Sequence, residues 1–227
     1  MKAARALTVG GVLGFLLLTG VSALRYPGGT QADRSSEGYA FFGNYWCDLY
    51  RSQALNGEDH AVGAQLAQVG ALAVVLAIFA GLWCASAWFE GQRPRRATRA
   101  LSGIACLGML AIPLMPADRF GRLHFLVIGV SAVPALLALA LASVAVVRGA
   151  ARATPPAHGL RVLTRVVFVG ALLHFAQYVA ELVGGPAYGV GVPAIQKVVT
   201  LLILLWLVVV ALTPLASAPP SAPTREH

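Results

Sequence analysis

Long apolar runs separated by short polar segments dominate this chain. Several of the runs reach about 18 residues or more, which is the length of helix that crosses about 30 Å of hydrocarbon. The pattern predicts an all-α fold, a bundle of six transmembrane helices. The predicted spans cover residues 6–24, 62–89, 100–115, 123–147, 162–183 and 193–213.

The charge content supports the same class of protein. Only 11% of the 227 residues are charged, whereas soluble domains carry about 25%. The net charge of +8 does not indicate nucleic-acid binding, because the basic residues lie in a few short loops rather than along a basic groove with aromatic platforms. Membrane lipids are therefore the predicted partners.

The basic residues also predict an orientation. With the N-terminus inside, eleven of the 17 Lys and Arg residues and two acidic residues fall on the cytoplasmic side. Six basic and seven acidic residues then fall outside. By the positive-inside rule, this distribution predicts a multi-pass protein of the bacterial inner membrane with both termini in the cytoplasm.

The two ends of the chain leave one alternative open. The first apolar run ends near Val21-Ser22-Ala23, a small-x-small pattern that resembles a signal-peptidase site, so cleavage competes with retention as a first helix. We expect retention. The tail, residues 216–227, is rich in Pro, Ala and Ser, and we expect it to be disordered.

The first outer loop, residues 25–61, holds the aromatic stretch Gly38–Leu49 with one acid, Asp48. Two interpretations remain open. The rings can settle at the membrane–water interface, or the stretch can dip into the bundle as a cap and bring Asp48 with it, which requires that its backbone be buried in protein or line a cavity. Cys47, the one cysteine in a loop, can be a reactive or paired thiol.

Polar side chains gather toward the outer ends of the predicted spans, where each charge is a functional candidate because charges inside a bilayer are costly. His174, Gln177, Tyr178 and Glu181 have offsets of 0, 3, 4 and 7 and so share one helical face. The candidate ligand-binding residues are Asp48, Asp118, His124, His174 and Glu181.

Three arrangements of these residues compete. They can be ion pairs such as Asp118 with Arg122 and Glu181 with Lys197. They can form a pocket for a lipid, a quinone or a small polar ligand. They can also hold zinc through Asp118, His124 and Glu181, with Asp48 as a further candidate ligand, although no His-x-x-x-His or Cys-x-x-Cys motif is present. The leading prediction is that the protein binds no cofactor. Haem is disfavoured because His124 and His174 fall at different predicted depths.

Two stretches carry a family resemblance. Tyr26–Gly29 followed by Gly38–Leu49, and Pro116–Asp118 followed by His124 on the next helix, resemble the DUF998 type of bacterial six-helix membrane protein. The resemblance implies the fold and a retained first helix, and it implies no activity. Its motifs match this chain at Asp48, Asp118 and His124.

The predicted function is therefore a non-enzymatic membrane protein with a polar outer pocket for a lipid or small molecule. The alternative is a metal-dependent hydrolase that acts in the outer leaflet and uses the same residues as ligands of a water-activating metal. A looser likeness to membrane hydrolases of lipid amides points the same way, but the His-x-x-x-His element expected there is missing. A transporter ranks third, because the inner halves of the spans offer no polar path.

Overall fold

The computed structural model describes residues 1–153, 157–184 and 191–214, and it is 78% helical. Six of its helices are long and apolar enough to cross a membrane. They are α1 (Lys2–Leu24), α2 (Ala61–Ser86), α3 (Gln92–Leu114), α5 (Arg122–Arg152), α6 (His158–Gly184) and α7 (Val192–Leu212). Two short elements, the 3₁₀ helix η1 (Trp46–Tyr50) and α4 (Ala117–Phe120), lie in connecting segments. The all-α bundle is thus the observed architecture, and the predicted tail 216–227 lies outside the described residues.

The predicted spans and the observed helices differ most at α3. The apolar run begins near residue 100, but the helix begins at Gln92. Its first turns hold four arginines, and arginine is a good helix former. Pro94 is tolerated there because the first backbone N–H groups of a helix have no intrahelical partner. Hydropathy marks where a helix enters hydrocarbon, whereas the helix itself continues into the polar region.

Five helices form a closed ring. In the order α2, α3, α5, α6, α7, each packs on the next, and α7 packs back on α2. The remaining helix, α1, lies outside the ring against α2 and α7. Small residues permit this close approach: a Cβ added at Gly11 of α1 would lie 2.6 Å from the carbonyl oxygen of Ala73 on α2. Such small-residue contacts are typical of helix packing in membranes.

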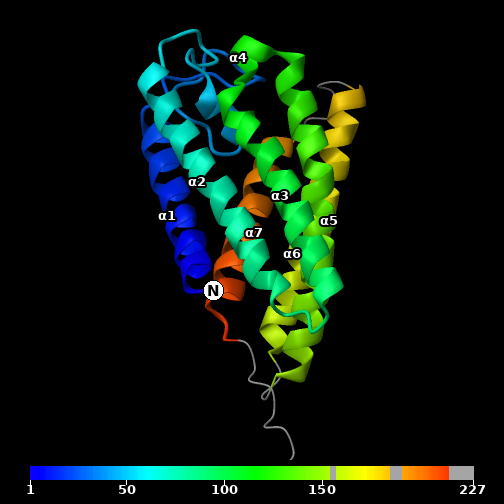
Figure 1. Cartoon of the computed structure of the whole chain (residues 1–227). Helices are drawn as coiled ribbons and strands as arrows, with labels where there is room; N and C mark the ends of the chain where they lie inside the picture. Colours follow the sequence, from blue (N-terminus) through cyan, green and yellow to red (C-terminus); the bar gives the residue numbers. More distant parts are fainter. Residues whose placement is uncertain (154–156, 185–190, 215–227) are drawn as a thin grey trace, which may run out of the picture.

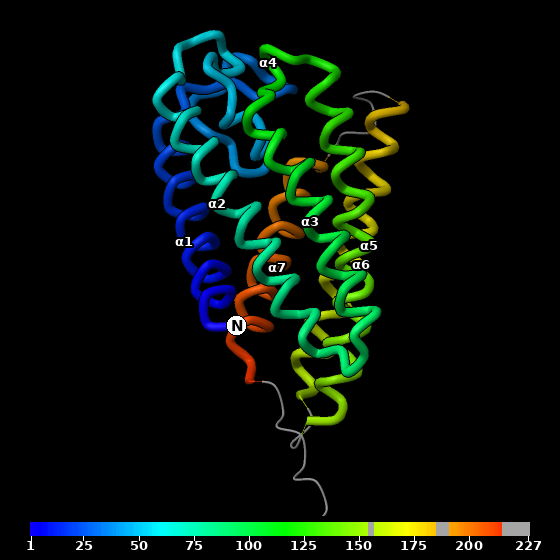
Figure 2. Tube along the Cα trace, viewed as in Figure 1, coloured from blue at the N-terminus to red at the C-terminus, as the bar shows by residue number. Residues whose placement is uncertain are grey.

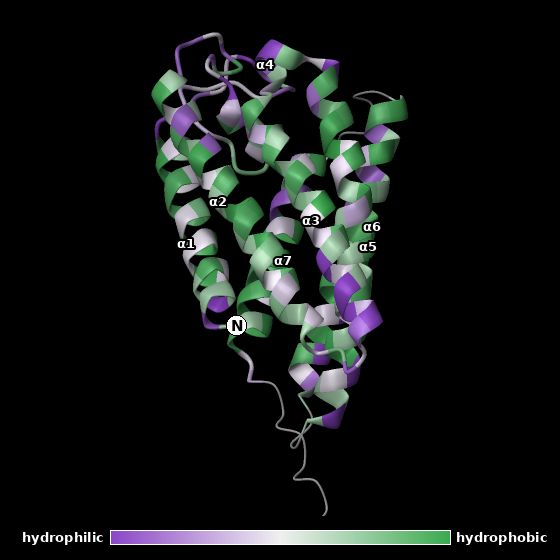
Figure 3. Cartoon of the chain, viewed as in Figure 1, coloured by the Kyte–Doolittle hydropathy of each residue, from purple (hydrophilic) through white to green (hydrophobic). Residues whose placement is uncertain are grey.

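The two ends of the bundle are built differently. One end is covered by residues 25–60, here called the cap, together with α4 (Figure 1). The opposite end, here called the N-terminal end, holds Met1 and the last turn of α7 (Figure 2). Hydrophilic residues concentrate at both ends, and the helices between them are largely apolar (Figure 3).

Many large apolar side chains point away from the bundle. Leu17, Leu107, Val130 and Leu173, on four different helices, are each more than 60% exposed. In water such a surface would be an aggregation liability, whereas lipid tails solvate it. The chain is therefore a multi-pass membrane protein.

Candidate functional site

The cap begins with a tight double turn at Gly28 and Gly29. Both glycines have positive φ, +155° and +87°. A Cβ on Gly29 would lie 2.4 Å from the backbone nitrogen of Asn56, so no larger residue fits this close crossing of two chain segments. The turn brings the start of the cap against its end and frames the aromatic stretch between them.

Asn44 organises the aromatic stretch from within. Its side chain is fully buried, and its Oδ1 accepts a hydrogen bond from the backbone N–H of Ala40 at 2.9 Å. Its Nδ2 donates to the carbonyl of Gly29 at 2.8 Å and to Oδ2 of Asp48 at 3.3 Å. One amide therefore supplies the partner of the Ala40 N–H and of the Gly29 carbonyl and adds a second hydrogen bond to Asp48.

The stretch dips into the bundle, as one of the two interpretations predicted. The ring of Trp46 packs edge-on against Phe15 of α1, with centroids 5.3 Å apart. Phe15 is nine residues from the cap end of α1, which corresponds to about 14 Å along the helix axis. Non-helical backbone at such a depth needs hydrogen-bond partners from the protein.

Helix α7 supplies these partners. Its first residues lie lower in the bundle than the start of α5 and the end of α6, and the cap lies over them (Figure 1). Oε1 of Gln196 accepts a hydrogen bond from the backbone N–H of Trp46 at 2.9 Å. Nζ of Lys197, a fully buried residue, donates to the carbonyl of Asn44 and lies 5.3 to 5.6 Å from the ring centroids of Tyr39, Phe41 and Trp46. Ring faces attract a cation, so these contacts help to stabilise the buried ammonium group.

A cavity of about 990 Å³ lies inside the helix ring, below the cap. Side chains from α2, α3, α5, α6 and α7 line it, and residues of the cap close part of its upper end. At this end the cavity reaches the surface, because its lining residues Gln31, Ala32 and Phe42 are exposed. At the other end it stops at the buried side chains of Leu82, Trp206 and Leu207.

Four of the five candidate residues line this cavity: Asp48, His124, His174 and Glu181. On α6, the predicted polar face is largely observed, since His174, Tyr178 and Glu181 face the cavity. Gln177, the other predicted member of that face, is not among the lining residues.

The two carboxylates in the cavity wall have partners within the protein. Oδ2 of Asp48 accepts the backbone N–H of Tyr45 at 2.8 Å as well as the Asn44 amide. Oε1 of Glu181 accepts the hydroxyl of Tyr45 at 2.7 Å, which ties the cap to α6. Burial raises the pKa of the Asp48 carboxyl above its usual range, against the lowering effect of these hydrogen bonds.

The two histidines of the cavity wall have fewer hydrogen-bond partners than the two carboxylates. His124 is fully buried, and its Nδ1 lies 2.7 Å from the carbonyl oxygen of Met115. A carbonyl can only accept, so Nδ1 carries the proton and Nε2 of the neutral ring holds a lone pair. Within the described part of the chain, neither Nε2 of His124 nor Nδ1 of His174 has a hydrogen-bond partner.

Asp118 lies outside the cavity wall. It is exposed, and its Oδ2 accepts both the backbone N–H and the hydroxyl of Ser52 at 3.1 Å. The predicted ion pair with Arg122 is wrong, because the helix is interrupted at Gly121, where φ is +50°, so the i, i+4 spacing does not hold. Asp118 instead fastens the end of the cap to α4.

The predicted pair of Glu181 with Lys197 is also wrong. Glu181 accepts from Tyr45, and Lys197 donates to backbone carbonyls. Among residues 1–153, 157–184 and 191–214, the ion pair found within 4.0 Å is Arg152 with Glu90, at the other end of the bundle. Loop backbone and tyrosine side chains satisfy the groups for which we had predicted opposite charges.

The zinc arrangement is not formed either. In the described ranges, no three His, Cys, Asp or Glu side chains come close enough together to hold a metal ion, so Asp118, His124 and Glu181 do not form a ligand set. Cys47 is a free thiol in the cavity wall, and burial raises its pKa to about 12. It therefore stays protonated at neutral pH and is a poor nucleophile.

Sequence reasoning missed several residues that build the site. The sequence points to Lys197 only as an ion-pair partner and to Tyr45 only as one of the interfacial aromatic rings, and it does not single out Asn44, Gln196 or Arg51. Lys197 did give a signal, because a lysine inside an otherwise apolar run requires a partner. The partner of Lys197 is a loop carbonyl 153 positions away, and no local pattern points to it.

Comparison of the chain with family models, curated proteins and solved structures finds no match. The DUF998 resemblance stays a prediction.

Proposed function

We propose that this protein binds a single-chain or otherwise slender amphiphile in the cavity below the cap. The observation that carries the proposal is the cavity's polarity gradient. Its charged lining residues, Asp48, Arg51 and Glu181, lie toward the cap with His124. His174 lies about 10 Å deeper along α6 than Glu181, and beyond it the inner end is apolar. A ligand with a polar head and an apolar tail matches this order.

The dimensions support a ligand with a tail. His124 and Leu139 both line the cavity, and at about 1.5 Å per residue they lie about 22 Å apart along α5. A volume of about 990 Å³ is at the upper end of the range for ligand sites, roughly 300–1,000 Å³. A small polar solute would leave most of the apolar wall without contacts.

The opening at the cap end suggests how the site is used. The mouth lies next to Gln31 and Phe42, so the head of the ligand sits near the surface and the tail points into the bundle. The metal-dependent hydrolase remains the alternative function, but no ligand set in the described chain supports it.

We also propose that the cap faces away from the cytoplasm of a bacterial inner membrane. Lys2 and Arg5 of α1, the four arginines in the first turns of α3, and the arginines at the end of α5 and the start of α6 belong to the N-terminal end, which the positive-inside rule assigns to the cytoplasm. With the native cysteines replaced by alanine, Ser35→Cys should react with an impermeant maleimide on intact cells, and Gly91→Cys should not. The reverse labelling would overturn the orientation.

Trp206 gives a direct test of cavity binding. Its indole lines the inner end of the cavity and is fully buried, so bulk lipid does not touch it. A dibromostearoyl chain in the cavity should quench its fluorescence, because bromine quenches at contact. The quenching assigned to the cavity is the part that disappears in Trp206→Phe.

Two substitutions on α5 provide the matched comparison. Ala135 lines the cavity, and Val133, two residues away, is 49% exposed on the outside of the bundle. Ala135→Phe should abolish the Trp206 quenching, and Val133→Phe should leave it unchanged. Quenching that is absent from the natural chain, or that survives Ala135→Phe, would contradict the proposed function.

A further inference from the structure

The cap end of the cavity contains a cation that forms no hydrogen bond or ion pair with the described residues. Arg51 lines the cavity directly after η1. Across the described ranges its guanidinium makes no hydrogen bond or ion pair, and its Nε is buried with no partner. An arginine that is buried in part normally finds a carboxylate or carbonyl, because an unpaired charge away from water is costly.

His124 lies at the same end of the cavity, and its Nε2, a hydrogen-bond acceptor, has no partner among the described residues. The cap is fastened to α4 by Ser52 and Asp118. Ser52 follows Arg51, and Asp118 precedes the start of α5 by four residues, so this link brings Arg51 toward His124. With Nδ1–H given to Met115, the free Nε2 can accept a hydrogen bond from an acidic O–H or take up its proton.

The carboxylates of the cavity, Asp48 and Glu181, form no ion pair with Arg51. Asp48 and Glu181 already accept hydrogen bonds from Asn44, Tyr45 or both. Burial favours the neutral form of Asp48. This end of the cavity can therefore bind an anion next to Arg51 and an acidic O–H next to Nε2 of His124.

We propose that the ligand is an anionic amphiphile whose acidic head, a phosphate monoester or similar oxyacid, binds between Arg51 and His124. This inference rests on the proposed function and names the class of ligand. The planar guanidinium pairs two N–H groups with two oxygens of the head. The O–H of the monoanionic head donates to Nε2 of His124, and the tail runs along α5 toward Trp206.

A matched pair of probes tests the head. Dibromostearoyl lysophosphatidic acid and dibromostearoyl monoacylglycerol share the tail and the glycerol and differ in the phosphate. We expect the phosphate probe to quench Trp206 with an affinity about tenfold to a hundredfold higher, the range for hydrogen bonds to charged groups. Arg51→Gln should remove this preference. Arg51→Lys keeps the positive charge but not the paired N–H groups of the guanidinium, so it should retain part of the preference.

Arg34 provides the control variant. It also lies in the cap, but it is exposed and its guanidinium donates to the carbonyl of Leu55 and to Gln31. Arg34→Gln should keep the full preference for the phosphate probe. A preference that survives in Arg51→Gln, or that is lost equally in Arg34→Gln, would overturn the role of Arg51.

The remaining outcomes separate this inference from the function on which it rests. Equal affinity for the two probes in the natural chain would overturn the anionic head and leave amphiphile binding intact. Displacement of the phosphate probe by glycerol 3-phosphate at equal concentration would identify a soluble anion and overturn the amphiphile. Failure of both probes to quench Trp206 would overturn the proposed function itself.

Discussion

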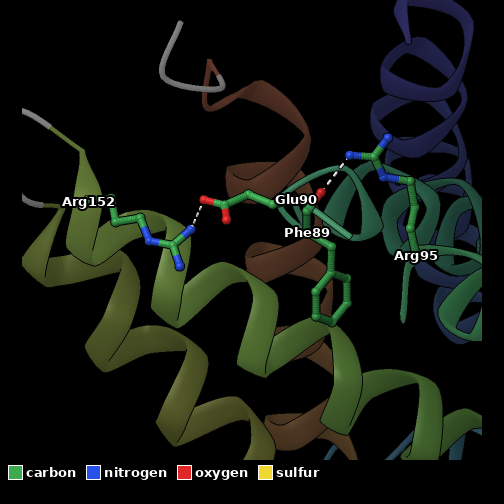
Figure 4. Close-up of polar contacts among 4 residues, drawn as sticks. All are labelled: Phe89, Glu90, Arg95 and Arg152. Carbon is green, nitrogen blue, oxygen red and sulfur yellow. Dashed lines mark hydrogen bonds and ion pairs between the residues drawn. The ribbon is translucent and has the colours of Figure 1, made fainter. Parts of the chain in front are cut away.

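The cap end and the N-terminal end of the bundle hold their polar groups in opposite ways. At the N-terminal end, Arg152 pairs with Glu90, and Arg95 donates to the carbonyl of Phe89 (Figure 4). The side chains of Arg152 and Glu90 are 57% and 78% exposed. At the cap end, Asn44 and Lys197 are fully buried, and their partners come from segments far apart in the sequence.

The difference separates two uses of polar residues in a membrane protein. Exposed charges near the membrane surface contribute little to stability, because water screens them, but they fix the orientation of the chain. Buried polar groups contribute through the penalty that follows when a partner is lost. Substitutions at the cap end should therefore change stability and binding, whereas substitutions at the N-terminal end should change mainly topology.

The largest effect is expected at Asn44. Asn44→Ala leaves the N–H of Ala40 and the carbonyl of Gly29 without their partners, at a cost of about 3 kcal/mol in the free energy of unfolding. Thermal unfolding in detergent measures it. The control is Asn56→Ala in the same loop, because the hydrogen bonds of Asn56 with Glu58 are exposed. Equal losses in the two variants would contradict the assigned role of Asn44.

A smaller effect is expected where the cap meets α6. Tyr45→Phe leaves Oε1 of Glu181 without its hydroxyl partner, which should cost about 1–2 kcal/mol. The measurement is a double-mutant cycle with Glu181→Gln, which isolates the interaction of the two side chains. A coupling energy of zero would show that this contact does not hold the cap.

The stability of the protein should also depend on pH through Asp48. Because burial raises the pKa of Asp48 in the folded state, the folded protein binds more protons than the unfolded chain above pH of about 4, where a free aspartate ionises. Stability should therefore fall as the pH rises through this window. Asp48→Asn should remove that part of the slope in melting temperatures measured from acid to neutral pH. Identical slopes in the natural protein and in Asp48→Asn would show that Asp48 does not cause this pH dependence.

The smallest effect is expected at the N-terminal end. Glu90→Gln breaks the exposed pair with Arg152 and should change the free energy of unfolding by less than about 1 kcal/mol. The same thermal unfolding series measures it beside Asn44→Ala. A loss as large as that of Asn44→Ala would remove the contrast between the two ends.

The sequence predicted the helices well because hydropathy is a local property that acts along each run of residues. It also predicted that polar groups meet at one end, since His174 and Glu181 share a helical face and His124 starts a helix. It did not predict the pairing of those groups. The ion pairs expected for Asp118 and Glu181 gave way to Ser52 and Tyr45, because a folded loop offers donors that have no periodic signature.

The cavity could not have been predicted by the same reasoning. Its shape depends on which faces of five helices meet. Its lining groups that lack a hydrogen-bond partner in the described residues, among them Arg51, His124 and His174, depend on where every other polar group finds a partner. A lone histidine at a helix start is compatible with many roles. Its fixed tautomer, set by the carbonyl of Met115, narrows them.

The dependence of the cap on α7 has a consequence for biosynthesis. Trp46 and its partner Gln196 are 150 residues apart, and a ribosome adds about 5–20 residues per second, so about 8–30 s pass between the synthesis of the two. During this time the cap has lost water without gaining its final hydrogen bonds, or it waits outside the bilayer. Entry of the last helix then brings a lysine into the membrane and completes the cap in one event. A chain released before that point would lack the wall that α7 gives to the cavity and the two hydrogen bonds that α7 gives to the cap.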